Sequence, residues 1–391
     1  MNHVMNVYKR LPVRFERGEG VWLWDDKGKK YLDAVGGMAV NILGHSHPRV
    51  IQAIQEQASK LIHCSNLYES TKQSELATAL CKLSALDKAF FCNSGAEAVE
   101  VALKLARLYG HQKGLECPKI LVTEHAYHGR TLACISAGGN FKNQKNFDPL
   151  LPGFVRVPFN DIPAIQAAAK AHPDIAAILI EPIQGERGII VPHDDYLRNI
   201  RKICDAHGWL MMLDEVQTGL GRTGTFFRYQ AEGIKPDVLS LAKGLANGVP
   251  IGACLAQLPY ADLFEHGAHG ATFGGNHLSC NTALATLEVI EEEQLVQHAQ
   301  KQGALLIQSL RAAFKDNPHI IDIRGKGLMI GIEFNQPCAD MMFEALEQGI
   351  LFTVSHQTTI RLLPSLRITD AEVAELVKRL STVVHAYSFS S

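Results

Sequence analysis

The sequence has no excess of charge of either sign and no closely spaced cysteines. Its 38 lysines and arginines are matched by 40 aspartates and glutamates, which gives a formal net charge of −2. Such a balance does not indicate a surface for nucleic acid or for an anionic membrane. The nine cysteines are scattered without a Cys-x-x-Cys pair, so neither a disulfide framework nor a zinc knuckle is predicted. These absences favour a small polar partner and a reducing cytoplasm.

Long apolar runs are absent as well. The N-terminal segment MNHVMNVYKRLPVRFERGEG has charges and a proline where a signal peptide would have its apolar core. The longest uncharged tract, residues 244–261, contains two prolines and three glycines. These would leave backbone groups unpaired in lipid, so the tract is predicted to be loop and short strand. We therefore expect neither export nor a membrane span.

Short apolar runs alternate with helical patterns between about residues 50 and 285. Runs this short and this continuously hydrophobic are typical of strands covered on both faces. We predict strands at 88–93, 119–123, 176–182, 209–215 and 237–243. Helices are predicted over 99–109 and 196–207, each stopped by a glycine, Gly110 or Gly208. Strand, helix and strand at this spacing predict an α/β fold with a mostly parallel sheet.

The chain is long enough for two or three domains, since it has 391 residues. We assign residues 51–284 to a large domain, and residues 1–50 together with 285–391 to a smaller α+β domain built from both termini. The last helix is predicted within TDAEVAELVKRL, where Thr369 and Glu372 have the spacing of a capping box. Ligands of open parallel sheets bind beyond the carboxyl ends of the strands, so chemistry is expected at the predicted strand exits.

The first two exits offer an anion site and an aromatic face. Ser94 and Gly95 precede a helix that begins near Ala96, and free N–H groups at a helix start bind phosphate. A simple helix cap would use the same residues. After the second strand, Tyr127 could cover an aromatic ligand and Arg130 could form a fork to a carboxylate. A half-buried tyrosine and a solvated arginine are the structural alternative.

Histidines and glutamates at these exits are open to several interpretations. His125 and His128 are close enough in sequence to be metal ligands. No third ligand follows at a standard spacing, so no metal is predicted. Glu181 in EPIQGERG is expected to be a solvated loop carboxylate. For Glu186, in the same stretch, the residues alone do not decide between a solvated and a functional carboxylate.

The fourth and fifth exits place a carboxylate and an amine at the ends of apolar strands. Asp214 would be costly to bury unless a positive group met it. A protonated ring nitrogen at about 4 Å, with an effective dielectric of about 20, would supply roughly 4 kcal/mol. Lys243, partly desolvated at the mouth of the sheet, suits a nucleophilic amine. Phosphate cradle, aromatic face, carboxylate and amine together fit pyridoxal phosphate.

The glycine string GLGRTG, residues 219–224, could instead mark a dinucleotide site. That fingerprint belongs at a strand-to-helix turn, whereas here the extended and aromatic segment TFFRYQ follows. We predict that the string is a loop that shapes the rim of the pocket. A nicotinamide-dependent oxidoreductase remains the distant alternative.

With these motifs in place, the chain resembles the class III aminotransferases of pyridoxal-phosphate fold type I, and among them most closely the acetylornithine aminotransferases. The resemblance extends over nearly the whole length. It is carried in order by YLDAVGGMAVNILGHSHP, NSGAEA, HGRT, EPIQGE, LDEVQTGLGRTG, LAKGLANGVPIGA, TFGGN, RGKGLMIGIEF and IRLLPSL.

The resemblance implies a role for individual residues of the cofactor site. Lys243 matches the lysine that holds the cofactor covalently, and Asp214 matches the carboxylate at the pyridine nitrogen. Tyr127 stands where the family usually has a phenylalanine stacked on the ring, and Thr272 matches a threonine that reaches the phosphate of the neighbouring subunit. The remaining positions implied to bind cofactor are Gly95, Ala96, Glu215, Val216 and Gln217, the last near the ring hydroxyl.

The resemblance also implies the substrate site and a homodimer with shared active sites. Arg130 matches the arginine that takes the α-carboxylate of the substrate, and Ala271 lies near the substrate. Glu186 and Arg361 match a pair in which the glutamate masks the arginine until glutamate or 2-oxoglutarate arrives. The pattern implies no role for nucleic acid or membrane.

The reaction expected from the resemblance is a ping-pong transfer in arginine biosynthesis. The terminal amine of N2-acetylornithine would pass to the cofactor and then to 2-oxoglutarate, giving glutamate. Succinylornithine, N-succinyl-diaminopimelate, ornithine and 4-aminobutyrate remain alternative donors, because the pocket walls that choose the donor come from distant segments.

Overall fold

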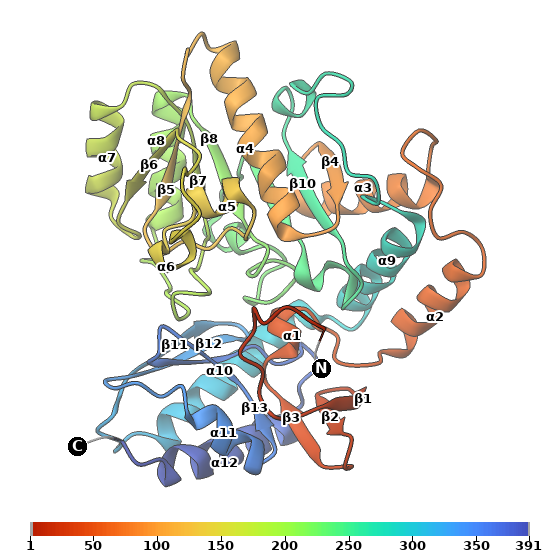
Figure 1. Cartoon of the computed structure of the whole chain (residues 1–391), viewed down its shortest axis with the longest axis vertical. Helices are drawn as coiled ribbons and strands as arrows, with labels where there is room; N and C mark the ends of the chain where they lie inside the picture. The colour runs from red at the N-terminus through yellow and green to blue at the C-terminus, as the bar shows by residue number, and fades with distance from the viewer. Residues whose placement is uncertain (1–2, 390–391) are drawn as a thin grey trace.

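The computed structural model describes residues 3–389. Its centre is a seven-stranded sheet (Figure 1). All neighbouring strands are parallel except at β10, which is antiparallel to both its neighbours. The predicted α/β fold with a mostly parallel sheet is therefore confirmed. In sheet order, the strands are β4 (Lys88–Cys92), β10 (Gly252–Ala256), β9 (Val238–Leu241), β8 (Leu210–Asp214), β7 (Ile175–Ile180), β5 (Lys119–Thr123) and β6 (Phe154–Val157).

Both faces of this sheet are covered, which explains the continuously apolar strands. Every residue of β7 and β8 is buried. Alternate side chains enter two separate cores: Leu179 and Met212 pack with helix α4 (Gly95–Gln112), while Ile178 and Met211 point into the other core. Because side chains alternate along a strand, neither face could have been polar.

The predicted end is correct for one of the two helices of this region and wrong for the other. Helix α8 (Tyr196–His207) ends at Gly208, which has φ 62°, as predicted. Helix α4 instead runs through Gly110, so the predicted stop is wrong. A Cβ on Gly110 would lie 2.3 Å from Cβ of Pro118. This glycine therefore permits close packing against a neighbouring segment and does not end the helix.

Segments from both ends of the chain lie together in the lower half of Figure 1. One sheet has the order β1-β2-β3-β13 and joins β13 (Ile350–Leu351) in parallel to β3 (Lys30–Asp33). Helix α12 (Asp370–Ala386) begins with the predicted capping box of Thr369 and Glu372. Helix α9 (His277–Glu292) packs on α2 and α3 and continues past residue 285, so the domain boundary proposed there falls inside a helix.

The other elements complete these layers. They are β1 (Phe15–Glu19), β2 (Trp22–Asp25), α1 (Gly36–Ala39), α2 (Pro48–Ala58), α3 (Thr71–Ser84), α5 (Leu132–Ala137), α6 (Phe141–Gln144), α7 (Ile162–Ala171), α10 (Leu295–Ala313), β11 (Ile320–Lys326), β12 (Met329–Phe334), α11 (Met341–Glu347), β14 (Thr353–Ser355), β15 (Thr359–Leu362), and the 3₁₀ helices η1 (Arg228–Glu232), η2 (Lys243–Ala246) and η3 (Tyr260–Asp262).

The glycine string of residues 219–224 does not shape the pocket rim, and that prediction is corrected. Arg222 is fully buried and its Nη1 donates to the carbonyls of Leu328 at 3.0 Å and Pro364 at 2.5 Å. The backbone of Gly327 lies so close that a Cβ there would be 2.5 Å from the carbonyl carbon of Thr223. The string therefore joins the central sheet to the C-terminal segment.

Among residues 3–389, no helix is long and apolar enough to cross a membrane.

Replacing Gly327 by alanine tests this contact. Gly327 has φ +53° and meets backbone, whereas Gly233 has φ +63° and nothing within 4 Å of the added Cβ. Both changes should cost about 1–2 kcal/mol for the left-handed backbone. Gly327→Ala should cost about 1–3 kcal/mol more, because the contact must open. Denaturant unfolding of the two variants checks this; equal losses would contradict close docking.

Candidate active site

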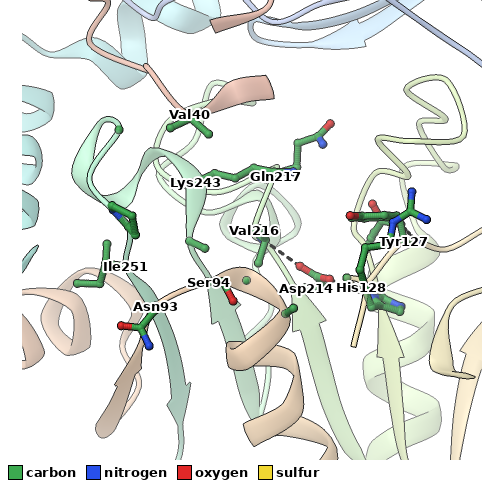
Figure 2. Close-up of a pocket in the computed structure, with 18 of the residues that line it drawn as sticks. Val40, Asn93, Ser94, Tyr127, His128, Asp214, Val216, Gln217, Lys243 and Ile251 are labelled. Carbon is green, nitrogen blue, oxygen red and sulfur yellow. Dashed lines mark hydrogen bonds and ion pairs between the residues drawn. The ribbon is translucent and has the colours of Figure 1, made fainter. Parts of the chain in front are cut away.

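A cavity of about 450 Å³ lies beyond the carboxyl ends of the central strands, as the predicted fold requires. The segments that follow β4, β5, β8 and β9 all contribute to its wall (Figure 2). The lining residues used below are Ser94, Gly95, Ala96, Tyr127, His128, Arg130, Glu181, Asp214, Val216, Gln217 and Lys243. The structure thus brings together most of the residues that the sequence placed at the strand exits.

The start of α4 forms one end of the cavity. Ser94 caps the helix by accepting the N–H of Glu97 at 3.2 Å. The N–H groups of Gly95 and Ala96 belong to the first turn, where helical N–H groups have no partner within the helix. A Cβ on Gly95 would lie 2.8 Å from Cγ1 of Val216, so only glycine fits this wall. The turn can hold an anion such as a phosphate.

Asp214 is buried and held from two sides. Its Oδ2 lies 2.8 Å from Nδ1 of His128, and its Oδ1 accepts the N–H of Val216 at 3.1 Å. Because a carboxylate only accepts, Nδ1 of His128 carries the proton. The side chain of Asp214 is 5% exposed and that of His128 is 0% exposed. This ion is therefore fixed at the floor of the cavity.

The role of His128 was missed by sequence reasoning, which weighed it only as a metal ligand beside His125. The two histidines face different partners, since the ring of His125 lies 5.6 Å from that of His356. Within residues 3–389, no group of three His, Cys, Asp or Glu side chains could hold a metal ion. The sequence could not predict the contact between His128 and Asp214, because the two residues are 86 positions apart and meet only where the segments that follow β5 and β8 come together.

Lys243 follows β9 and enters the same cavity. Burial lowers the pKa of its amine, although the nearby carboxylates of Glu186 and Asp214 oppose the shift. A lowered pKa leaves more of the amine neutral and nucleophilic. The residue has φ +46°, a left-handed backbone that is uncommon outside glycine and is often found at functional sites. The amine is thus poised for attack on a carbonyl.

Tyr127, Arg130 and Gln217 offer recognition groups. Cζ of Arg130 lies 5.4 Å from the centre of the Tyr127 ring, and Arg130 is exposed. Oε1 of Gln217 is buried without a hydrogen-bond partner, so a ligand hydroxyl at this position would satisfy it. The site fits pyridoxal phosphate group by group. The first turn of α4 suits its phosphate and Gln217 its hydroxyl, while Asp214 suits its ring nitrogen and Lys243 its aldehyde.

Two buried glutamates depart from the sequence expectations. Glu181, expected to be solvated, is 5% exposed, and burial raises its pKa to about 7. Glu215, implied to bind cofactor, does not line the cavity. Its carboxylate accepts from the backbone of Arg228 at 2.7 Å and of Tyr229 at 3.0 Å, and burial raises its pKa to about 7. Glu215 therefore holds the start of the 3₁₀ helix η1.

Arg361, on β15, and Glu186 do not line the cavity, but both act electrostatically on Lys243. Nη1 of Arg361 donates to Oε1 of Glu186 at 2.7 Å and to the carbonyl of Gly185 at 3.3 Å. Although burial would raise the pKa of Glu186, the guanidinium lowers it below its ordinary value. Nε of Arg361 is buried without a hydrogen-bond partner. The ion pair can thus be exchanged for another carboxylate that uses the free N–H.

Ala271 and Thr272 are not brought to this cavity. They line a separate hollow of about 820 Å³ together with Ser65, Asn66 and Leu67. Thr272 is exposed, and Leu67 and Phe273 beside it are 86% and 61% exposed. Within one chain these two residues are therefore outside the pocket.

Comparison with known proteins agrees with this geometry. The family model described as aminotransferase class-III matches residues 4–384. A protein named acetylornithine aminotransferase from Nitrosomonas europaea is 50% identical over 98% of each chain. Among solved structures, an ornithine aminotransferase from Toxoplasma gondii has a TM-score of 0.95 at 34% identity, covering 98% of this chain and 93% of that one. An acetylornithine aminotransferase from Elizabethkingia anophelis has a TM-score of 0.89 at 37% identity, covering 98% and 97%.

The cavity and the comparisons lead to the same result. The residues at the strand exits fit the cofactor on which this family depends, and the family model covers nearly the whole chain. The chain belongs to the class III aminotransferases, and is a pyridoxal-phosphate-dependent transaminase.

Proposed function

We propose that the chain transfers the terminal amine of N2-acetylornithine to 2-oxoglutarate in two half-reactions. The observation that carries the proposal is the presence of two carboxylate binders beside one amine. Arg130 at the cavity mouth makes no hydrogen bond or ion pair with the described residues 3–389, while Arg361 is masked by Glu186 at 2.7 Å. A donor with one carboxylate needs only Arg130. An acceptor with two carboxylates can also displace Glu186.

The bound cofactor would supply an electron sink for the carbanion formed at the substrate carbon. Lys243 would hold the cofactor, be released when the donor binds, and then carry the proton between the reacting carbons. Asp214, fixed by His128 at 2.8 Å, would keep a ring nitrogen protonated. Tyr127 would cover one face of the ring, and the first turn of α4 would bind the phosphate.

The donor carboxylate is assigned to Arg130 for a physical reason. Glu186 already neutralises Arg361, since the carboxylate and the guanidinium lie 2.7 Å apart with the Arg361 side chain 3% exposed. A donor that reached Arg361 would have to displace the Glu186 carboxylate from a guanidinium that is itself buried, whereas Arg130 is exposed. The arrangement favours a donor that presents its ω-amine to Lys243 and its α-carboxylate to the cavity mouth.

A homodimer is part of the same proposal. Ala271 and Thr272 lie outside the cavity of their own chain, yet the family pattern pairs such a threonine with a cofactor phosphate. The neighbouring side chains of Leu67 and Phe273 are largely exposed, and apolar groups gathered in this way are typical of protein interfaces. A second copy would bring Thr272 to the first turn of α4.

Ornithine is the rival donor with direct support, since the Toxoplasma gondii structure with a TM-score of 0.95 is named an ornithine aminotransferase. Succinylornithine, N-succinyl-diaminopimelate and 4-aminobutyrate use the same amine chemistry. A half-reaction assay that measures conversion of the bound cofactor by each diamine, acylated or free, separates them. The glycine string gives no support to a nicotinamide-dependent oxidoreductase, because Arg222 within it bonds to the carbonyls of Leu328 and Pro364 and so joins two parts of the fold.

Lys243→Ala should abolish the covalent link to the cofactor and reduce transamination to background, because no other residue assigned to this cavity supplies an amine. Borohydride reduction of the wild type, followed by peptide mapping, should leave the cofactor on the peptide that contains Lys243. Lys235→Ala, on the loop before β9, serves as the control. Retained turnover by the Lys243 variant, or a label on another lysine, would overturn the assignment.

Arg130→Ala should raise the donor Michaelis constant about 10-fold to 100-fold, since a charge-assisted hydrogen bond is worth about 1.5–3 kcal/mol. The acceptor constant should change less, because 2-oxoglutarate also binds Arg361. Arg130→Lys keeps the charge without the fork and should be intermediate. Steady-state kinetics with each substrate varied checks this; an unchanged donor constant would refute the role of Arg130.

A further inference from the structure

Glu181 joins two walls of the cavity that the chain builds from different segments. It directly follows β7, where its side chain is buried. Its Oε1 accepts the N–H of Tyr127 at 2.8 Å, and its Oε2 accepts the N–H of Gly185 at 3.2 Å. One carboxylate therefore fixes the backbone of the aromatic wall and the backbone just before Glu186.

Gly185 is one of the groups that hold the side chain of Arg361 in position. Its carbonyl accepts from Nη1 of Arg361 at 3.3 Å. A Cβ at this position would lie 2.1 Å from Oε1 of Gln217, so the backbone is pressed against a side chain of the cofactor pocket. The side chain of Arg361 has two hydrogen-bond partners among the described residues, Glu186 and Gly185. When a substrate carboxylate displaces Glu186, only the Gly185 carbonyl stays in place.

We infer that Glu181 is a positioning residue for the keto-acid acceptor: by holding Gly185 it keeps Arg361 seated while Glu186 is exchanged for the distal carboxylate of the acceptor. The inference rests on the proposed function, in which the acceptor is the substrate that unmasks Arg361. The donor, which binds with the Glu186–Arg361 pair closed, does not depend on this contact. Glu181 thus acts on one half-reaction more than on the other.

A carboxylate is the group that can do this. Its two oxygens accept from two N–H groups at once, whereas a glutamine amide has one oxygen and would turn its NH₂ toward one of the donors. Burial raises the pKa of Glu181 to about 7; Asp214 adds to the rise, while His128 and the two backbone donors oppose it. Glu181 also opposes the lowering of the pKa of Lys243 by burial. If the amide oxygen keeps the shorter contact, to Tyr127 at 2.8 Å, the substitution removes the longer contact, to Gly185 at 3.2 Å, without removing bulk.

The test compares Glu181→Gln with Glu215→Gln. Both glutamates are buried, both accept two backbone N–H groups, and both have a pKa raised to about 7. Only Glu181 lines the cavity. Glu181→Gln should raise the Michaelis constant for 2-oxoglutarate about 10-fold and leave the donor constant within about two-fold. Glu215→Gln should lower the melting temperature without separating the two constants.

A second measurement is independent of turnover. Hydrogen exchange followed by mass spectrometry on the cofactor-free protein should become faster in the peptide containing Gly185 in Glu181→Gln, and should not in Glu215→Gln. Glu181→Asp, whose shorter side chain reaches only one of the two donors, replaces the glutamine variant if that variant does not fold. Visible absorbance of the loaded variants shows whether cofactor binding is retained.

The outcomes distinguish this inference from the proposed function. If the wild type uses another ω-amine, the proposed donor is wrong, but the acceptor constant of Glu181→Gln still tests the inference with that donor. If donor and acceptor constants rise equally, or exchange near Gly185 does not change, Glu181 is only structural and the inference is overturned. A raised acceptor constant with faster exchange supports it.

Discussion

A buried carboxylate is stable only where donors or cations meet it. Two such groups, Glu181 and Asp214, line the cavity, and a third, Glu215, follows Asp214 directly. Glu181 and Glu215 are met by backbone N–H groups, and Asp214 by His128 and the N–H of Val216. Each of these donors comes from a segment that follows a strand or lies in a neighbouring loop. The cost of burial therefore forces the loops at the strand exits into one arrangement.

The second constraint is the junction between the central sheet and the C-terminal segment. Arg361 is on β15 and Glu186 follows β7, so their ion pair at 2.7 Å exists only if the two parts of the chain are held at a fixed separation. Arg222 and Gly327 provide this, through two hydrogen bonds to carbonyls and a backbone contact that leaves no room for a side chain. The glycine string that resembles a nucleotide motif thus helps to hold Arg361 and Glu186 at their observed separation.

Sequence reasoning succeeded where a local pattern is enough. Apolar runs predicted five of the seven central strands, β4, β5, β7, β8 and β9, but not β6. Glycine predicted the end of α8, and the spacing of Thr369 and Glu372 predicted the cap of α12. Order along a parallel sheet then placed Asp214 and Lys243 at one edge. It failed where the decisive partner is remote in sequence. His128 lies 86 positions from Asp214. Gly110 packs against Ala176 of β7 as well as Pro118, and Glu181 is held by the backbone of Tyr127 and Gly185.

Under the proposed function, the same constraint would explain how one active site serves two substrates in turn. A permanent positive site for the second carboxylate would also attract the donor, so the free energy of the empty site must be lowered by an internal anion. Glu186 supplies that anion, and its pKa, lowered by Arg361, keeps it charged near neutral pH. The exchange costs little only if Arg361 stays where it is while its partner leaves. Its seat must therefore include a group that does not move with Glu186, and the carbonyl of Gly185, held through Glu181, meets that requirement.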